Sequence, residues 1–247
     1  MEEIARVALA ACADSGFVLA GGNALIAHNI GDRPTHDVDL FTNVADHESF
    51  DSALDRVTHA LEEQGAAVRR VDSGGTLARM YVTPAGQTDE ILVELSQDCP
   101  RFPAVDLDVG PVLDPRDALA NKPCALYDRR AARDYIDVHR ALESGVVGSW
   151  ADAIELADQQ SATPPPRDYV RQGSERAKDL DAGELARYGF SDSDVADLRH
   201  NFDKGVATVE EQMGQRRATF IARMAKDSAR PAVAPPSLDI QHRGPRL

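Results

Sequence analysis

The sequence predicts an α/β (α+β) fold, in which a mixed β-sheet with flanking helices is followed by a mainly helical C-terminal part. The chain has 247 residues, 43% of them hydrophobic and 28% charged, a composition typical of globular proteins with a buried core. Short apolar runs between Gly- and Pro-rich turns alternate with helical repeats in the first part of the chain. We therefore expect one domain over residues 1–145, a helical domain over 146–228 and a disordered tail over 229–247.

The first expected elements enclose a pair of glycines. A helix over residues 2–14 is followed by a short apolar strand, Phe17–Ala20, which stops at Gly21-Gly22. The next helix runs from Asn23 to Asn29, and a second strand, Val38–Phe41, comes after a Gly-Asp-Arg-Pro turn. The glycine turn thus lies between two buried strands.

One helix and three strands complete the expected sheet. Residues 47–63 repeat apolar side chains at helical spacing and end before Gly65. Strand-like runs follow over residues 67–71, 77–83 and 90–95, separated by turns that contain glycine or proline.

Helices account for the recognisable patterns in the rest of the chain. Asp114 and Pro115 predict the start of one helix, and another covers residues 132–142. Ser191 caps a long helix, with Asp194 three residues later in a variant of the capping box. We expect its apolar stripe to pack on its own domain; the stripe comprises Val195, Leu198, Phe202, Val206, Val209 and Met213.

Three carboxylates are candidate metal ligands. Asp37 and Asp39 are two positions apart in a strand, so both side chains project from the same face. Glu94 interrupts an apolar strand, where a buried carboxylate is costly without a cationic partner. Hard oxygen ligands of this kind suit Mg2+, and two such ions can stabilise the attacking and leaving oxygens of a phosphoryl transfer.

The glycine turn supplies the matching nucleotide-binding element. Gly21 and Gly22 have no side chain to keep a triphosphate from the backbone N–H groups, and Asn23 could donate an amide hydrogen bond to it. Glycines, carboxylates and their order along the chain together predict a magnesium-dependent nucleotidyltransferase with an NTP as substrate.

Net charge and cysteine content limit the expected ligands and the expected location of the protein. The formal net charge is -14, which argues against a general, sequence-blind binder of nucleic acids. An RNA acceptor held by a local basic patch stays possible on such an acidic chain. Cys12, Cys99 and Cys124 form neither a CxxC motif nor an even set, which favours a reducing, cytoplasmic location, and no apolar run is long enough to cross a membrane.

The same residues resemble a known superfamily. The run Leu-Ala-Gly-Gly-x-Ala-Leu, followed by Arg33-Pro-Thr-His-Asp-Val-Asp-Leu-Phe41, is similar to the first motif of polymerase-β-type nucleotidyltransferases. A helix lysine, Lys122, and the later Arg-x-x-x-Arg-Asp-x-x-Asp run, residues 129–137, resemble the AbiEii/AbiGii toxin family with its MenT branch. The family usually has Ser or Thr where this chain has Asn23, which implies a changed nucleotide preference or rate.

The resemblance implies roles for residues beyond the carboxylates. Lys122 would contact the triphosphate, and Asp134 would be the acidic residue of the fourth motif. Asp137 is the rival for that role, although it could equally form surface ion pairs one helical turn from its neighbours. Arg129, Arg130 and Arg133 concentrate positive charge that could contact RNA or phosphate, or could simply form a solvated helix face.

The resemblance also implies a biological role, that of the toxin in a toxin–antitoxin pair with a cognate antitoxin protein as partner. We expect transfer of a nucleotide to an RNA acceptor, preferentially the 3′ end of tRNA. Two alternatives remain open. One is a small-molecule nucleotidyltransferase of the aminoglycoside-modifying kind, whose cationic acceptor would suit the acidic chain. The other is a nucleotide-binding module without turnover.

Overall fold

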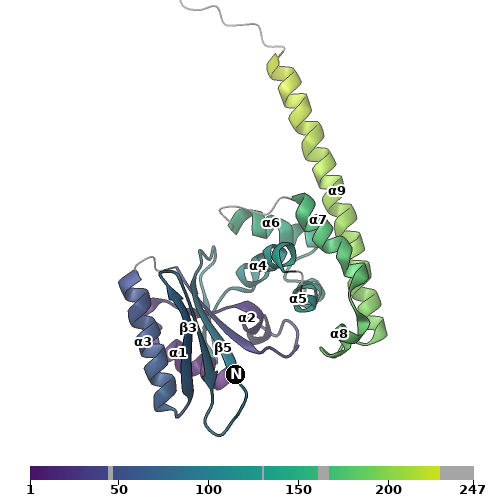
Figure 1. Cartoon of the computed structure of the whole chain (residues 1–247). Coiled ribbons are helices and arrows are strands. Elements are labelled where there is room, and N and C mark those ends of the chain that lie inside the picture. Colours follow the sequence, from purple (N-terminus) through teal and green to yellow (C-terminus); the bar gives the residue numbers. More distant parts are fainter. Residues whose placement is uncertain (44–46, 130, 161–166, 229–247) are drawn as a thin grey trace, which may run out of the picture. The chain divides into compact units, whose positions relative to one another are not determined.

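The computed structural model describes residues 1–43, 47–129, 131–160 and 167–228 (Figure 1). Residues Met1–Val209 form one compact unit, and the second unit, Glu210–Leu247, is described as far as Ser228. Two expectations from the sequence, a phosphate contact by Arg130 and a disordered tail over 229–247, lie outside the described residues.

A seven-stranded mixed sheet forms the centre of the first unit, with strand order β3-β4-β5-β2-β1-β7-β6. Strand β2 runs parallel to β5, and β1 runs parallel to β7, whereas the other neighbours are antiparallel. The expected fold class is therefore confirmed. The strands are β1 (Val18–Leu19), β2 (Asp37–Thr42), β3 (Ala67–Gly74), β4 (Leu77–Thr83), β5 (Ile91–Gln97), β6 (Val105–Leu107) and β7 (Gly110–Val112).

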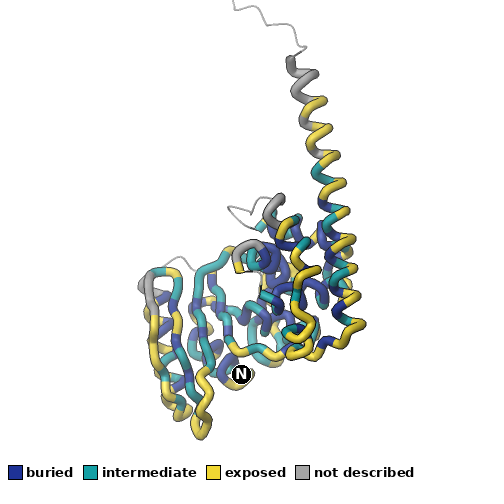
Figure 2. Tube along the Cα trace, turned by 45° about the vertical axis from the view of Figure 1, so that its right-hand side comes forward, coloured by how far each residue is buried: buried dark blue, intermediate teal, exposed yellow. Residues whose placement is uncertain are grey.

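The two faces of the central strands differ in burial, as the alternation of side chains requires. On one face Val38, Leu40, Met80 and Val93 are fully buried. Helices α1 (Glu2–Ala11) and α3 (His47–Glu63) cover that face (Figure 1). The opposite face carries the polar residues of β2, β4 and β5 and is only partly buried (Figure 2).

The helices on the other side of the sheet are α2 and those that follow β7. Helix α2 (Gly21–Ala27) packs on β2 and on α4 (Pro115–Asp128), which in turn contacts α5, α6 and α7. Asp114 caps α4 as expected, because its side chain accepts a hydrogen bond from the Arg116 backbone N–H. The remaining helices are α5 (Ala132–Glu143), α6 (Trp150–Gln160), α7 (Arg167–Glu175), α8 (Ala182–Ala186) and α9 (Asp192–Ser228).

The start of α9 follows the capping pattern seen in the sequence. The Ser191 backbone N–H donates to Asp194 Oδ2 at 2.8 Å, and the Asp194 N–H donates back to the Ser191 hydroxyl at 3.2 Å. Within the first unit Leu198 and Phe202 are buried, and Phe202 packs edge-on against Tyr135 and Trp150. This part of the apolar stripe therefore packs within the first unit, against residues of α5 and α6.

Three details differ from the expectations. Helix α1 ends at Ala11, and a short 3-10 turn, Ala13–Ser15, replaces its expected last turn. Helix α2 begins at Gly21 rather than Asn23, so the glycine pair forms its first turn. Strands β6 and β7 were not expected, because three residues each, with a proline inside β7, are too few for a period-two pattern.

No helix in the described ranges combines the length and the hydropathy needed to cross a membrane.

Candidate active site

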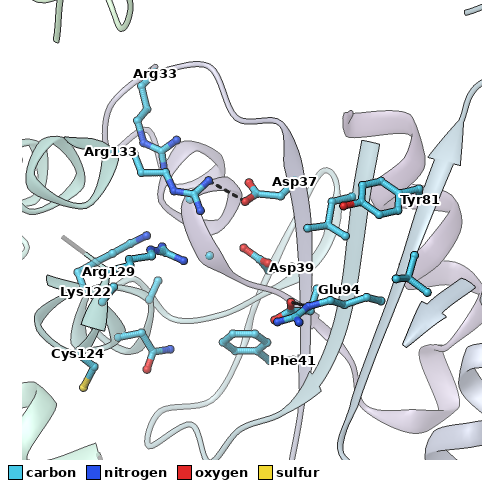
Figure 3. A pocket seen from close by; sticks show the side chains of 18 residues that line it. Arg33, Asp37, Asp39, Phe41, Tyr81, Glu94, Lys122, Cys124, Arg129 and Arg133 are labelled. Atoms are coloured by element: carbon cyan, nitrogen blue, oxygen red, sulfur yellow. Dashed lines mark hydrogen bonds and ion pairs between the residues drawn. The ribbon is translucent and has the colours of Figure 1, made fainter. Parts of the chain in front are cut away.

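A cavity of about 700 Å³ lies between the partly buried face of the sheet and helix α4 (Figure 3). Strands β2, β4 and β5 contribute one wall, and the glycines of α2, helix α4 and the start of α5 contribute the rest. The charged residues that line it are Arg33, Asp37, Asp39, Arg79, Glu94, Lys122, Arg129 and Arg133. The cavity therefore brings together carboxylates and cations that are distant in sequence.

The three candidate metal ligands share one face of two neighbouring strands. Asp37 and Asp39 alternate with buried residues along β2, so both point into the cavity (Figure 3). Strand β5 runs parallel to β2, and its register places Glu94 directly beside Asp39. Their proximity comes from strand pairing, a rigid support for closely spaced ligands.

The glycine turn approaches Asp39 closely. Gly21 has a φ of 60°, and a Cβ built on it would overlap Asp39 Oδ2. A Cβ on Gly22 would overlap Arg33 Nη2. Only glycine fits the first position, because both the left-handed backbone and the carboxylate exclude a side chain. Both glycines line the cavity, and Asp39 and Arg33 occupy the space that their side chains would take.

Asn23 is the predicted nucleotide-binding residue that the structure does not bring into the cavity. Its Nδ2 donates to the backbone oxygen of Asp37 at 2.5 Å, and its Oδ1 accepts from the Thr35 hydroxyl at 2.7 Å. The side chain instead borders a neighbouring hollow beside α1 and the β6–β7 turn. In this arrangement Asn23 supports the beginning of β2, and hence the position of Asp37.

Cations from α4 and α5 face the carboxylates. Lys122, Arg129 and Arg133 lie on the opposite side of the cavity from Glu94 (Figure 3). Arg133 Nη1 forms an ion pair with Asp37 Oδ2 at 3.0 Å. This cation wall, formed by Lys122, Arg129 and Arg133, has the chemistry needed to neutralise a triphosphate.

Two buried aspartates hold the cations in place. Asp134 accepts two hydrogen bonds from the Arg129 guanidinium, both at 2.8 Å, and lies 3.7 Å from Lys122 Nζ. Asp137 contacts Lys122 Nζ at 2.7 Å and accepts two hydrogen bonds from Arg33, at 2.6 and 2.8 Å. Neither aspartate lines the cavity, and the idea that Asp137 forms surface pairs is wrong, since its residue is only 5% exposed.

The surroundings raise the pKa of Asp39 and lower the pKa of Asp137. The pKa of Asp39 is raised to about 6, first by burial and then by the neighbouring charge of Asp37, against the opposing effect of Lys122. Burial also acts to raise the pKa of Asp137, but Lys122 and Arg33 outweigh it, so that this pKa is lowered. A stable anion thus supports the cations, whereas the ionised form of Asp39 is destabilised by its surroundings.

The donor set suits a hard divalent cation. Asp37, Asp39 and Glu94 offer only carboxylate oxygens, and a bound cation would favour the ionised form of Asp39, which burial and the charge of Asp37 disfavour. Over the described ranges, however, no three such side chains converge into a closed metal cluster. Two of the three are instead paired with arginines, Asp37 with Arg133 and Glu94 with Arg79.

Sequence reasoning missed several residues of the cavity. Arg33 lies inside the first motif, but its partner Asp137 is 104 residues away, so no local pattern indicates the pair. Arg79 and Tyr81 alternate along β4, and that alternation was a usable signal for a shared face with Glu94. Phe41 could have been found in the same way, as the next residue on the face of Asp37 and Asp39.

Comparisons with solved structures support the fold. A protein from H. pylori described as a nucleotidyltransferase gives a TM-score of 0.57 at 17% identity, over 85% of this chain and 95% of that chain. JHP933 from Helicobacter pylori gives a TM-score of 0.53 at 18% identity, over 88% of this chain and 95% of that chain. The nucleotidyltransferase toxin MenT4 from Mycobacterium tuberculosis, 16% identical over 79% of this chain and 85% of its own, has a TM-score of 0.38, too low to carry an argument.

Comparison with protein families is more specific. No curated protein matches the sequence. Residues 7–211, however, match the family described as nucleotidyl transferase AbiEii toxins of type IV toxin–antitoxin systems. That range contains all the carboxylates and cations of the cavity. The chain therefore belongs to the AbiEii nucleotidyltransferase toxin family.

Proposed function

We propose that this nucleotidyltransferase uses Mg2+ to transfer a nucleotide from an NTP to an RNA acceptor, with the 3′ end of tRNA as the preferred acceptor. The observation that supports the proposal is one cavity with the three carboxylates on one side and the cation wall on the other. Membership of the toxin family adds a cognate antitoxin protein as the expected partner.

The residues of the cavity suit each part of the reaction. The acceptor hydroxyl attacks the α-phosphorus of the NTP, and the bond to the pyrophosphate oxygen breaks. Lys122 and Arg129 neutralise the charge of the triphosphate and then of the leaving pyrophosphate. Bound Mg2+, held by Asp37, Asp39 and Glu94, would supply further charge neutralisation at the transferred phosphoryl group. Asp134 and Asp137 act as positioning residues, because they contact the cations and not the cavity.

The residues proposed to take part in the reaction all lie in the first part of the chain. Residues 1–145 carry the carboxylates, the glycine turn and the cation wall. We assign residues 146–228 to a helical domain, whose helices α6 and α7 pack against α4, the helix that carries Lys122.

Nucleotide incorporation tests the proposal. Purified protein is incubated with total bacterial RNA, Mg2+ and each α-labelled NTP in turn. Label should appear in a tRNA-sized band with the wild-type chain and with Asp89→Asn, a matched change of an exposed carboxylate outside the cavity. Asp39→Asn should lower incorporation by roughly 100-fold or more, because metal-assisted charge stabilisation is worth several kcal/mol. Equal labelling by folded Asp39→Asn protein would refute the proposed site.

A small-molecule acceptor is the second candidate. The net charge of -14 favours it, because an acidic chain attracts a cationic acceptor such as an aminoglycoside. Labelled aminoglycoside in the absence of labelled RNA would select this candidate. A module without turnover is disfavoured, since the family is one of nucleotidyltransferases.

A further inference from the structure

We propose that the open face of β3, β4 and β5 beside Glu94 binds the single-stranded 3′ end of the RNA acceptor. We call this surface the acceptor platform and define it by Arg69, Val71, Arg79 and Tyr81. The inference rests on the proposed function and adds the surface that would hold the RNA.

Strand register places the platform next to the carboxylates. Glu94 pairs with Asp39 on one side and with Arg79 on the other, so the three residues form one row across the sheet. A second row runs from Asp37 through Leu92 to Tyr81 and Arg69. Residues in register across neighbouring strands point to the same face. Both rows therefore lead from the reacting centre onto the platform.

The platform is accessible on this face. The side chains of Arg69 and Arg79 are 58% and 45% exposed, and Val71 is 54% exposed despite being apolar. On the other face of β4 the residues Met80 and Val82 are fully buried. Val71, Arg79 and Tyr81 also line the cavity, so a ligand that enters the cavity can reach the platform.

The chemistry of the platform fits single-stranded RNA. The Arg69 guanidinium lies 4.6 Å from the centre of the Tyr81 ring, which leaves an aromatic and a planar cationic group for unpaired bases. Arg69 pairs with Glu90 and Arg79 with Glu94, at 2.8 and 2.7 Å. The side chains of Arg69 and Glu90 are 58% and 45% exposed, and ion pairs this exposed are weak, so an RNA phosphate can compete for Arg69.

The platform is better suited to the acceptor than to the NTP. The cation wall, which suits a triphosphate, lies across the cavity from Tyr81, with Asp37 and Glu94 between them (Figure 3). A strand of RNA on the platform would bring its 3′ hydroxyl to Glu94, while the NTP occupies the side of Lys122 and Arg129.

Substitutions on the platform test this inference by direct RNA binding. Affinity is measured by fluorescence anisotropy with a 5′-labelled single-stranded RNA that ends in the 3′ sequence of tRNA, and KM values are measured for RNA and for NTP. Tyr81→Leu should weaken RNA binding and raise the KM for RNA by roughly 5- to 150-fold, the range expected for loss of one stacked base. The KM for NTP should change less than twofold.

Matched variants separate stacking from general damage. Tyr81→Phe keeps the ring and should retain RNA binding, whereas Tyr188→Leu, a tyrosine of the helical part, should behave as wild type. Arg69→Gln should weaken RNA binding and flatten its salt dependence, and Arg187→Gln, an exposed arginine outside the cavity, should not.

The outcomes distinguish this inference from the proposed function. If wild-type protein labels RNA but Tyr81→Leu leaves both RNA affinity and the KM for RNA unchanged, the platform is wrong and the function stands. If wild-type protein neither binds nor labels RNA, both are wrong. Binding that Tyr81→Leu abolishes, without any labelling of RNA, would support the platform and refute RNA as the acceptor of transfer.

Discussion

Asp137 shows how one buried carboxylate can organise the proposed active site without lining its cavity. Its two oxygens hold Arg33 and Lys122, and Arg33 in turn fills the space beside Gly22. Removing one partner from a buried ion pair is costly, because the remaining charge stays desolvated. We therefore expect Asp137→Asn to lower the free energy of unfolding by about 3 kcal/mol or more. Urea unfolding measures the change.

The control for this prediction is Asp89→Asn, since that carboxylate is exposed and lies outside the charge network. Its free energy of unfolding should stay within about 0.5 kcal/mol of wild type, as for most surface substitutions. A loss below about 1 kcal/mol for Asp137→Asn would mean that Arg33 and Lys122 find other anions, and that the carboxylate does not organise the cation wall.

At the scale of elements, the glycine turn at the start of α2 couples backbone conformation to the carboxylates. Gly21→Ala meets two penalties: the φ of 60°, and a Cβ that would overlap Asp39 Oδ2. Gly86→Ala in the turn between β4 and β5 meets only the first, because its φ is 74° and no described atom lies within 4 Å of the new Cβ.

This pair of variants isolates the close approach. Both should lose about 1 kcal/mol of stability from the left-handed backbone. Only Gly21→Ala should also lose nucleotide incorporation, by at least about 10-fold, because Asp39 must move away from its productive position. The test compares the nucleotide incorporation rates of the two variants, each corrected for the fraction of protein that is folded. Equal activity of the two variants would show that the contact with Asp39 is unimportant for transfer.

At the scale of the whole molecule, the sequence predicted features that depend on neighbouring residues, but it did not predict which distant residues pair in the fold. Alternation within one strand is a property of neighbouring residues, so the sequence alone predicts that Asp37 and Asp39 share a face. Glu94 could be nominated as a polar residue in an apolar strand, but its register with Asp39 depends on strands 55 positions apart along the chain, since 94 minus 39 is 55. Sequence periodicity carries no such long-range information.

The missed features have the same origin. The pair Arg33–Asp137 joins residues 104 positions apart. Each residue lies in a motif that the sequence reveals, but no local pattern indicates that the two are partners. Asn23 matched the motif by position, yet the fold turned its amide toward the Asp37 backbone and Thr35. Chemistry encoded in a contiguous motif was therefore predictable, whereas the partners that orient it are brought together only by the folding of the whole chain.

The raised pKa of Asp39, about 6, makes the stability of the whole metal-free protein depend on pH. Below pH 4 this carboxyl is protonated both folded and unfolded, so it contributes no difference. As the pH rises from 4 to 6, the unfolded chain loses the proton first, and the folded state is destabilised by roughly 1–3 kcal/mol. The Asp39→Asn variant lacks this carboxyl. In EDTA, the free energy of unfolding of the variant should therefore increase relative to that of wild type as the pH rises from 4 to 6, and the difference should stay constant above pH 6.

Urea unfolding of both proteins at several pH values measures the difference, in which the effects of the other carboxylates largely cancel. Adding Mg2+ at pH 7 should then stabilise wild type more than Asp39→Asn, because the ion binds the ionised carboxylate and so favours the folded state. Parallel stability curves in EDTA would show that Asp39 ionises normally. A common response to Mg2+ would show that the ion binds elsewhere, because a ligand stabilises only the state whose groups it contacts.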